Sequence, residues 1–280
     1  MAKEFEAYST TASNYDKTRA TIGEDLILGV LLSIGRPLHK LRLLDAGCGT
    51  GNYDEFLANH VGKIFCFDLE IAMLKRARKK LNGNQNTHFL VANAVDLPIK
   101  HASLDAVMMN QVAHHLEDPE NEEQYLQLEK FITCAFDVLR PGGVLILNTS
   151  SRTQVTDGYW WATLIPDAVA KVRRRYPPLS VIKKLMLDAG FYRMRKYVPL
   201  DAVLQAQAYF DPEGPLKKIW RNGDSTWSLA SKGELRKAMD KVKALISSRK
   251  IDEYFQEREQ LRHVVGQTTF MIVSKPKGQS

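Results

Sequence analysis

Short apolar runs alternate with amphipathic stretches along the first 150 residues of this chain. The apolar runs have the length of strands, and five are predicted, at residues 43–46, 61–67, 87–92, 104–109 and 144–148. Helices are predicted to begin near Asn52 and near Glu70, and a third is stopped by Leu139-Arg140-Pro141-Gly142-Gly143. Strands that alternate with helices are typical of a parallel sheet with helices packed on both faces.

The second half of the chain returns to this pattern only in part. One helix and two further strands are predicted, at residues 180–189, 191–198 and 268–274. Two segments outside them read as mainly helical, 151–179 and 199–265. All four tryptophans lie in these two segments, so large aromatic side chains concentrate outside the predicted sheet.

The composition is that of an ordinary globular protein. Of 280 residues, 44% are hydrophobic and 25% are charged, and no run of 18 apolar residues occurs. We therefore expect a cytoplasmic protein with no membrane partner. The three cysteines, Cys48, Cys66 and Cys134, show no C-x-x-C spacing, so neither a disulfide framework nor a metal site is expected.

Positive charge is concentrated in the second half of the chain. Residues 151–280 carry 24 Lys and Arg against 13 Asp and Glu, whereas residues 1–150 carry 15 against 19. Such a basic half is found in proteins that bind nucleic acid, and it also arises from solvated faces of amphipathic helices. The second interpretation is favoured, because the lysines of the helix predicted after Ser231 fall largely opposite its apolar face.

The most informative motif is the run from Leu43 to Gly51, which reads L-L-D-A-G-C-G-T-G. A strand enters an acidic residue, three glycines follow at alternating positions, and a helix begins. Glycine lets the main chain turn tightly and lets a ligand approach it closely. The spacing D-x-G-x-G-x-G differs from the G-x-G-x-x-G of dinucleotide folds. Asp68 ends the next strand 23 residues after Asp45, where a ribose would need an acceptor for its hydroxyls.

These motifs, with Asn93-Ala94 after the third strand and Leu-Arg-Pro-Gly-Gly before the fifth, resemble the class I S-adenosylmethionine-dependent methyltransferases. The resemblance is to the type 11-like, small-molecule branch. It implies a Rossmann-like α/β fold with a seven-stranded mixed sheet in the order 3-2-1-4-5-7-6. The implied division is cofactor-cap helices in 1–40, the S-adenosylmethionine-binding core in 41–150, helical substrate-lid insertions in 151–179 and 199–265, and the remainder of the core sheet in 180–198 and 266–280.

The resemblance also implies a set of cofactor-binding positions. Asp68 would bind both ribose hydroxyls, although it could instead cap the helix that follows it. Asn93 would contact the adenine where the family usually has Asp, and its amide can still accept a hydrogen bond. Arg19 would lie near the methionine carboxylate, or it could be an ordinary surface arginine. The expected set is Tyr15, Arg19, Asp45, Ala46, Gly47, Gly49, Gly51, Asp68, Leu69, Met73, Asn93, Ala94, Asn110 and Gln111.

Candidate groups for the methyl acceptor come from two places. His114 and His115 follow the fourth strand, and neighbouring residues on a helix point about 100° apart, so we expect only one to face the acceptor. We prefer His114 as a general base. The aromatic side chains of the insertions either line a pocket or pack the insertions together. The expected pocket residues are His115, Tyr159, Trp160, Trp161 and Tyr209.

Three functions are compatible with these patterns. A methyltransferase for a small organic acceptor is favoured, because aromatic-rich insertions accompany one compact catalytic core. A methyltransferase for RNA or protein would use the basic half for docking. A protein that binds S-adenosylmethionine without transferring its methyl group would carry the same motifs. The sequence predicts neither the acceptor atom nor the oligomeric state.

Overall fold

A computed structural model describes residues 20–116 and 125–278, and the chain divides into two compact units. We call Gly23–Thr149, Pro177–Tyr197 and Thr269–Ser280 the sheet unit. Met1–Ile22, Ser150–Tyr176 and Val198–Thr268 form the helical unit. Tyr15 and Arg19 lie outside the described residues.

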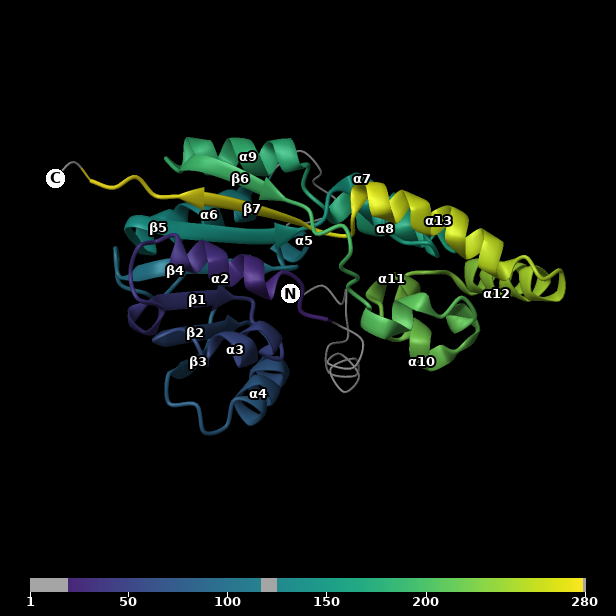
Figure 1. The fold of residues 1–280 in the computed structure, drawn as a ribbon, viewed down its shortest axis with the longest axis horizontal. Helices are drawn as coiled ribbons and strands as arrows, with labels where there is room; N and C mark the ends of the chain where they lie inside the picture. Colours follow the sequence, from purple (N-terminus) through teal and green to yellow (C-terminus); the bar gives the residue numbers. More distant parts are fainter. Residues whose placement is uncertain (1–19, 117–124, 279–280) are drawn as a thin grey trace. The chain divides into compact units, whose positions relative to one another are not determined.

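The sheet unit is built on seven strands whose order, β3-β2-β1-β4-β5-β7-β6, confirms the predicted topology (Figure 1). Strands β1 to β5 pair in parallel, and β7 pairs antiparallel with both β5 and β6. The strands are β1 (Arg42–Ala46), β2 (Lys63–Asp68), β3 (Thr87–Val91), β4 (Leu104–Asn110), β5 (Leu139–Thr149), β6 (Tyr192–Tyr197) and β7 (Thr269–Ser274).

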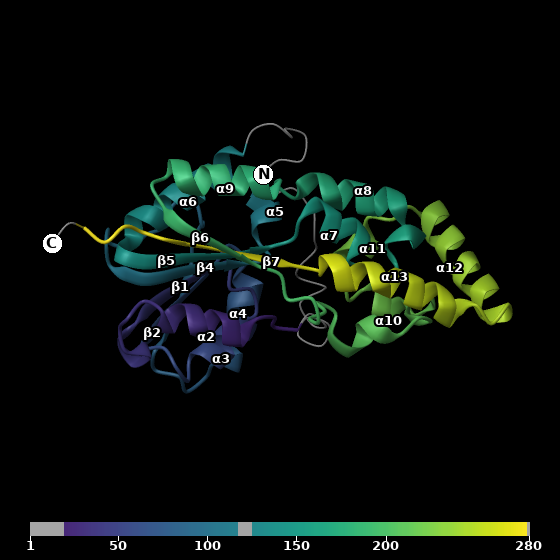
Figure 2. The same ribbon diagram turned by 45° about the horizontal axis from the view of Figure 1, so that its top comes forward.

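Helices cover both faces of this sheet (Figure 2). One face carries α2 (Glu24–Leu32), α3 (Asn52–Leu57) and α4 (Ile71–Lys80), and the other carries α6 (Leu126–Val138) and α9 (Leu179–Asp188). Shorter turns are η1 (Leu38–Lys40) and α5 (Ala113–Leu116). Phe131 and Ile132 of α6 and Ile182 of α9 are fully buried. They belong to one core cluster with apolar residues of the sheet, so amphipathic helices close the core on this face.

One predicted turn belongs to a strand. The segment 139–143 was expected to stop a helix and turn, whereas β5 begins at Leu139, which pairs with Leu104 of β4. The backbone of Gly142 has φ +81°, and its N–H donates to the carbonyl of Lys275 at 3.1 Å. The register between β4 and β5 shifts between Leu104 and Ala106. The Pro-Gly-Gly sequence is therefore an irregular start to the strand, although α6 does end just before it.

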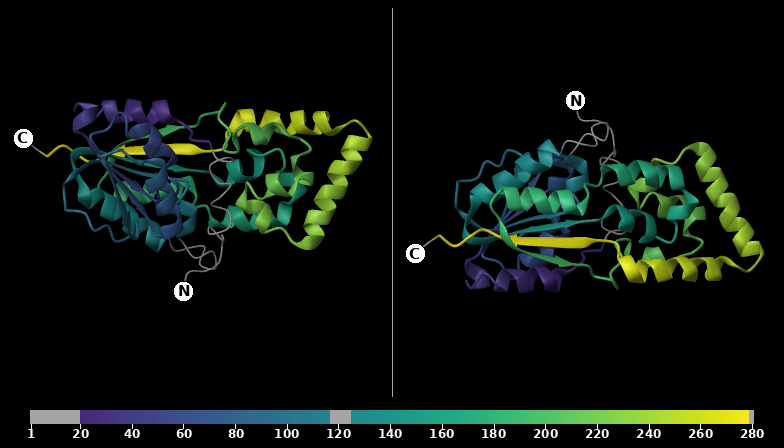
Figure 3. Two further views of the ribbon diagram at one scale, coloured as in Figure 1. Left: turned by 90° about the horizontal axis from the view of Figure 1, so that it is seen from below. Right: turned by 90° about the horizontal axis from the view of Figure 1, so that it is seen from above.

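The helical unit has a core of its own, made mainly of aromatic side chains. Trp160, Trp161, Tyr209 and Trp227 are almost fully buried in it. Figure 3 shows its two longest helices, α12 (Lys232–Ser247) and α13 (Ile251–Val265), meeting like two sides of a corner. The other elements are α7 (Arg152–Asp157), η2 (Ala162–Leu164), α8 (Pro166–Arg175), η3 (Ala206–Phe210), η4 (Gly214–Leu216), α10 (Lys218–Arg221) and α11 (Ser225–Ser228).

Among the described residues, none of the helices combines the length and the apolar composition that a membrane crossing requires.

Candidate functional site

The glycine loop between β1 and α3 wraps around the end of β2. The backbone N–H groups of Gly47 and Cys48 both donate to the carbonyl of Phe67, at 2.7 and 2.9 Å. Gly47 has φ +92°, and a Cβ built on it would lie 2.6 Å from Cγ2 of Val112. Gly51 has φ +77° and precedes the first residue of α3. Only glycine satisfies both this left-handed backbone and this close approach, which explains the spacing of the motif.

Gly49 differs from its neighbours in the loop. Its φ is +56°, and no atom of the described residues lies within 4 Å of a Cβ built on it. The N–H of Gly49 donates to Oδ2 of Asp68 at 2.8 Å. The carboxylate of Asp68 therefore holds the loop through the N–H of Gly49. The side of Gly49 toward which a Cβ would point is open to a ligand.

Asp68 ends β2 and is fixed by two backbone donors. Its Oδ2 accepts from Gly49 and its Oδ1 accepts from the N–H of Glu70, each at 2.8 Å. Burial raises the pKa of Asp68, and these two backbone hydrogen bonds act in the opposite direction. Each carboxylate oxygen can accept more than one hydrogen bond, so the half-buried side chain keeps acceptor capacity for a ligand. Asp68 is not the N-cap residue of α4, which is Glu70.

The other predicted cofactor positions lie at the ends of neighbouring strands, with differing exposure. Leu69 is 61% exposed, whereas Met73 is 3% exposed and packs in the core. Asn93 is exposed, and its Oδ1 accepts from the N–H of Val95 at 3.2 Å. Ala94 is 9% exposed and belongs to the core cluster of the sheet unit. The structure thus brings Asp68, Leu69 and Asn93 to one edge of the sheet, whereas Met73 is buried in α4.

The end of β4 carries two polar side chains in an unusual setting. Both side-chain amide atoms of Asn110 are buried, and neither has a hydrogen-bond partner among the described residues. Gln111 has φ +54°, and its N–H donates to the carbonyl of Asn148 at 2.8 Å. A buried amide without a partner costs free energy, typically about 1–3 kcal/mol, until a ligand or water satisfies it.

The side chains at this edge of the sheet match the chemical groups of S-adenosylmethionine. Asp68 offers a fixed acceptor for ribose hydroxyls, Asn110 offers an unsatisfied donor and acceptor, and Leu69 offers an exposed apolar side chain beside them. Gly49 adds a stretch of main chain with no side chain in front of it. A polar, sugar-containing ligand with a flat base would use each of these features.

Behind the glycine loop lies a buried group of acids and thiols, Asp45, Asp54, Cys48 and Cys66, that no sequence motif marks as a group. Asp54 of α3 is fully buried, and the Cys66 thiol of β2 is its hydrogen-bonding neighbour. Burial raises its pKa to about 7, against the lowering effect of the nearby Cys66 thiol and Lys80 ammonium. Asp45 is 2% exposed, and burial and the charges of Asp54 and Asp68 raise its pKa. The only sequence signal was an acidic residue in the first turn of a helix.

The thiols of this group are inert packing groups. A hydrogen bond to Cys66 and burial both raise the pKa of Cys48. A thiol that resists ionisation is a poor nucleophile. Cys48, Cys66 and Cys134 are free thiols in the structure.

The pKa of Asp54 predicts a pH-dependent stability that Asp54→Asn removes. The folded protein holds this proton up to about pH 7, whereas the unfolded chain releases it near pH 4. The free energy of unfolding therefore falls as pH rises from about 4 to 7 and is flat above. Thermal unfolding of Asp54→Asn should show a gain in Tm over the parent protein that is several degrees larger at pH 8 than at pH 5. Glu55→Gln, on the exposed neighbour, should show no such difference, and equal gains at both pH values would contradict a buried proton on Asp54.

The two histidines lie side by side in α5. Their ring centroids are 4.0 Å apart, with the planes at 41°, and both side chains are half-buried. They lie in the short helix that begins at Ala113, three residues after the end of β4. The structure therefore keeps His114 and His115 at the same sheet edge as Asn110, and which of them faces an acceptor stays a prediction.

The predicted aromatic pocket residues lie in the helical unit, where three of them are engaged in its core. Nε1 of Trp160 donates to the carbonyl of Tyr209, and Nε1 of Trp161 donates to Oε1 of Gln205, each at 2.8 Å. The hydroxyl of Tyr209 donates to Oε2 of Glu259 at 2.7 Å. Tyr159 is half-buried, with its ring centroid 4.9 Å from that of Trp161. The packing interpretation therefore accounts for Trp160, Trp161 and Tyr209, and Tyr159 has the most accessible side chain of the four.

Residues 44–147 match the family described as a methyltransferase domain. Over 157 residues the chain is 33% identical to the demethylmenaquinone methyltransferase of Lactococcus lactis. The aligned region covers 53% of this chain and 59% of that protein. It is 28% identical over 232 residues to the ubiquinone/menaquinone biosynthesis C-methyltransferase of Vibrio parahaemolyticus. This alignment covers 70% of this chain and 83% of that protein. The chain spans about half the length of several curated relatives that it matches.

A solved structure shows the same fold. It is a putative methyltransferase from an antibiotic biosynthesis pathway of Anabaena variabilis, with a TM-score of 0.68 and 21% identity. The likeness covers 88% of this chain and 96% of that chain. The family match runs from β1 into β5, through the strands whose ends form the site described above. Residues 44–147 are therefore similar to a methyltransferase domain, and the fold is the one that class I methyltransferases, which use S-adenosylmethionine as cofactor, share.

Proposed function

We propose that this protein transfers the methyl group of S-adenosylmethionine to a small organic acceptor. The observation that carries the proposal is the pairing of the glycine loop with Asp68. The carboxylate holds the N–H of Gly49 at 2.8 Å, while the outer side of Gly49 is open. A main chain and a carboxylate fixed in this way form a preorganised surface for a ribose and the groups attached to it.

The residues at the sheet edge divide the task of binding. Asp68 accepts from the ribose hydroxyls, and Leu69 and Asn93 contact the adenine. Asn110 satisfies its buried amide against the cofactor, beside Gln111 at the end of β4. Arg19 and Tyr15 precede the described residues, and their part in holding the methionine carboxylate stays a prediction.

The chemistry required of the chain is modest. S-adenosylmethionine, when bound, supplies a methyl group on a positively charged sulfur that is already activated for displacement. The protein needs no nucleophile of its own. It has to hold the acceptor atom in line at about 3 Å, exclude water and, where the acceptor carries a proton, remove that proton.

A small acceptor is supported by the relatives and by the connectivity of the chain. The printed names of two relatives refer to demethylmenaquinone and to ubiquinone and menaquinone biosynthesis. In this chain, β5 leads directly into the helical unit at Ser150, and the helical unit returns to the sheet unit at Thr269. We assign recognition of the acceptor to the helical unit, with the half-buried Tyr159 as the aromatic side chain most available for contact.

One observation favours a second candidate. The last turn of α8 carries Arg173, Arg174 and Arg175, in the half of the chain with an excess of positive charge. A surface of this kind would dock RNA or an acidic protein.

Methyl transfer from radiolabelled S-adenosylmethionine into a cell extract separates these functions. The extract is resolved afterwards into small-molecule, protein and RNA fractions. Label in the small-molecule fraction supports the proposal and allows the product to be identified. Label in RNA or protein, lost at high salt, would instead make the basic half a docking surface. Tight binding of S-adenosylmethionine without label in any fraction would identify a protein that binds the cofactor and does not transfer its methyl group.

His114→Ala tests the proposed base. General-base catalysis contributes about 10²–10⁴-fold to a rate. We therefore expect turnover to fall at least about tenfold. Affinity for S-adenosylmethionine should stay unchanged, because Asp68 and the glycine loop are intact. Turnover is measured with the identified acceptor across pH 6 to 9, and His60→Ala, at an exposed position outside the predicted site, serves as the control. Unchanged turnover in His114→Ala would remove this residue from the mechanism.

A further inference from the structure

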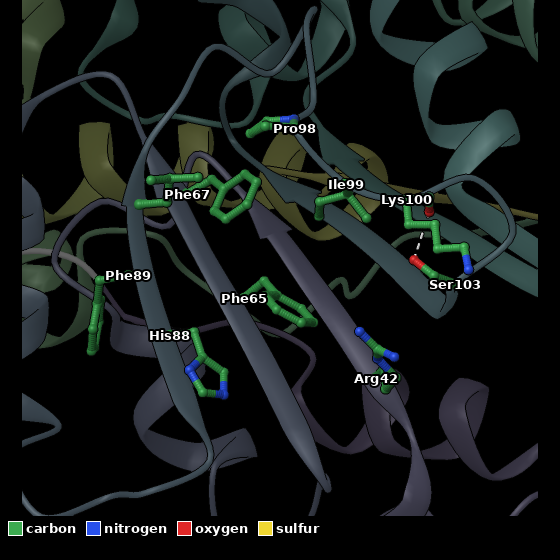
Figure 4. A pocket seen from close by; sticks show the side chains of 10 residues that line it. Arg42, Phe65, Phe67, His88, Phe89, Pro98, Ile99, Lys100 and Ser103 are labelled. Carbon is green, nitrogen blue, oxygen red and sulfur yellow. Dashed lines mark hydrogen bonds between the residues drawn. The ribbon is translucent and has the colours of Figure 1, made fainter.

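A second pocket lies on the sheet unit, away from the glycine loop. It has a volume of about 300 Å³ and is lined by residues of β1, β2, β3 and the loop before β4 (Figure 4). Residues 92–103 cross this part of the sheet as a loop without a helix. The β2–β3 end of the sheet therefore keeps side chains that a crossing helix would otherwise cover.

The floor of this pocket is a row of flat groups. The ring of Phe65 lies between His88 and Arg42 (Figure 4). Its centroid is 5.6 Å from that of His88 and 5.5 Å from the guanidinium carbon of Arg42. Burial and the nearby Lys63 charge lower the pKa of His88, so its imidazole is a neutral ring at neutral pH. Such a row offers stacking surface to a flat ligand.

Opposite this floor, the loop contributes apolar and basic side chains. Pro98 and Ile99 line the pocket from the loop, followed by Lys100. The hydroxyl of Ser103 donates to the carbonyl of Lys100 at 2.6 Å, which fixes the loop at this point. The pocket is therefore apolar where the rings lie and basic at one end.

The basic end carries uncompensated charge. Nε of Arg42 is buried and has no hydrogen-bond partner among the described residues. Within the same part of the chain, no carboxylate forms an ion pair with Arg42 or Lys100. Asp105, which accepts from the backbone N–H of Arg42 at 2.8 Å, is held by the side chains of Arg36 and Arg140. The guanidinium of Arg42 is thus left to an external anion.

We propose that this pocket binds an aromatic carboxylate. The carboxylate would accept from the two terminal nitrogens of the half-buried Arg42, a bidentate geometry that guanidinium groups favour. Lys100 adds a second positive charge, and the ring of the ligand lies against Phe65 and Phe67 beneath Ile99. This site does not depend on the methyl-transfer proposal, because its occupancy is measured by binding and not by turnover.

Protein-observed NMR on the isotope-labelled full chain and calorimetry, both with 2-naphthoate, test the site. We expect saturable binding that is unaffected by S-adenosylhomocysteine, with amide shifts at Phe65, His88 and Lys100. Cyclohexanecarboxylate, which lacks the flat ring, and 2-naphthalenemethanol, which lacks the charge, should each bind at least about tenfold more weakly. Displacement by S-adenosylhomocysteine, or equal binding of either analogue, would overturn the assignment, as would tighter binding of inorganic phosphate.

Two variants locate the anion. Arg42→Leu should weaken 2-naphthoate binding at least about tenfold, since a charged hydrogen-bonding partner is lost. Arg195→Leu, on a half-buried arginine of β6 in the same unit, should leave it unchanged. Lys100→Gln, at an exposed position, gives a weaker loss in the same direction and keeps the test valid if Arg42→Leu does not fold. Unchanged affinity in the Arg42 and Lys100 variants would refute the site.

Discussion

Asp68→Ala is expected to weaken the binding of S-adenosylmethionine by about a hundredfold or more. The carboxylate is placed to accept from two ribose hydroxyls, and a hydrogen bond to a charged group contributes about 1.5–3 kcal/mol. The same substitution removes the acceptor of the Gly49 N–H, which Asp68 holds at 2.8 Å. The loop therefore loses its support together with the ligand contact. Affinity is measured by calorimetry on the purified chain, without any acceptor.

Two further variants separate the ribose contact from general effects. Asp68→Asn keeps one acceptor oxygen and the size of the side chain, so its loss should be about tenfold and lie between the parent and Asp68→Ala. Glu70→Ala removes an exposed acid two residues away while leaving its backbone N–H in place, and should bind normally. Full affinity in Asp68→Ala would rule out a ribose contact and leave Asp68 as a support of the loop alone.

The sequence predicted the sheet because its strands and turns follow from local patterns. A strand, an acidic residue and alternating glycines fix the turn after β1 within nine residues, and Asp68 follows at the end of the next strand. The family resemblance then supplied the order in which the strands pair, including the antiparallel β7 that lies between β5 and β6. Each of these features depends on near neighbours or on a topology shared by a whole family.

What the sequence did not predict depends on contacts between distant residues. Asp54 reads as a solvated acid in a first helical turn, and only the packing of α3 against the loop and Cys66 of β2 buries it. The start of β5 at Leu139 follows from pairing with Leu104, 35 residues earlier in the numbering. Hydrophobicity alone does not distinguish a tryptophan in a core from one in a pocket, and Trp160 and Trp161 proved to be packed. Likewise, no motif marked Arg42, Phe65 and His88, which three different strands bring together.

Replacing Gly47 or Gly49 by alanine is expected to affect different properties, mainly stability for Gly47 and mainly cofactor affinity for Gly49. A Cβ on Gly47 would lie 2.6 and 3.1 Å from the two methyl carbons of Val112, on a backbone with φ +92°. Overpacking and left-handed strain each cost about 1–3 kcal/mol, so Gly47→Ala should lower the Tm by several degrees and weaken cofactor binding with it. The double variant Gly47→Ala/Val112→Ala should recover the part of the Tm that is due to the clash.

Gly49→Ala separates ligand contact from stability, because its Cβ meets no described atom within 4 Å. We expect a small loss of Tm from a φ of +56°, and a larger one in Gly83→Ala, whose φ of +97° lies outside the left-handed region that alanine adopts and whose Cβ is equally unobstructed. Affinity for S-adenosylmethionine should fall at least about tenfold in Gly49→Ala and not at all in Gly83→Ala. The methyl group at position 49 would stand where the cofactor meets the main chain, so the contrast isolates that contact from backbone strain. Normal binding by Gly49→Ala would mean that the open side of the loop does not face the cofactor, and the ligand would then have to approach through Asn110 and the end of β4.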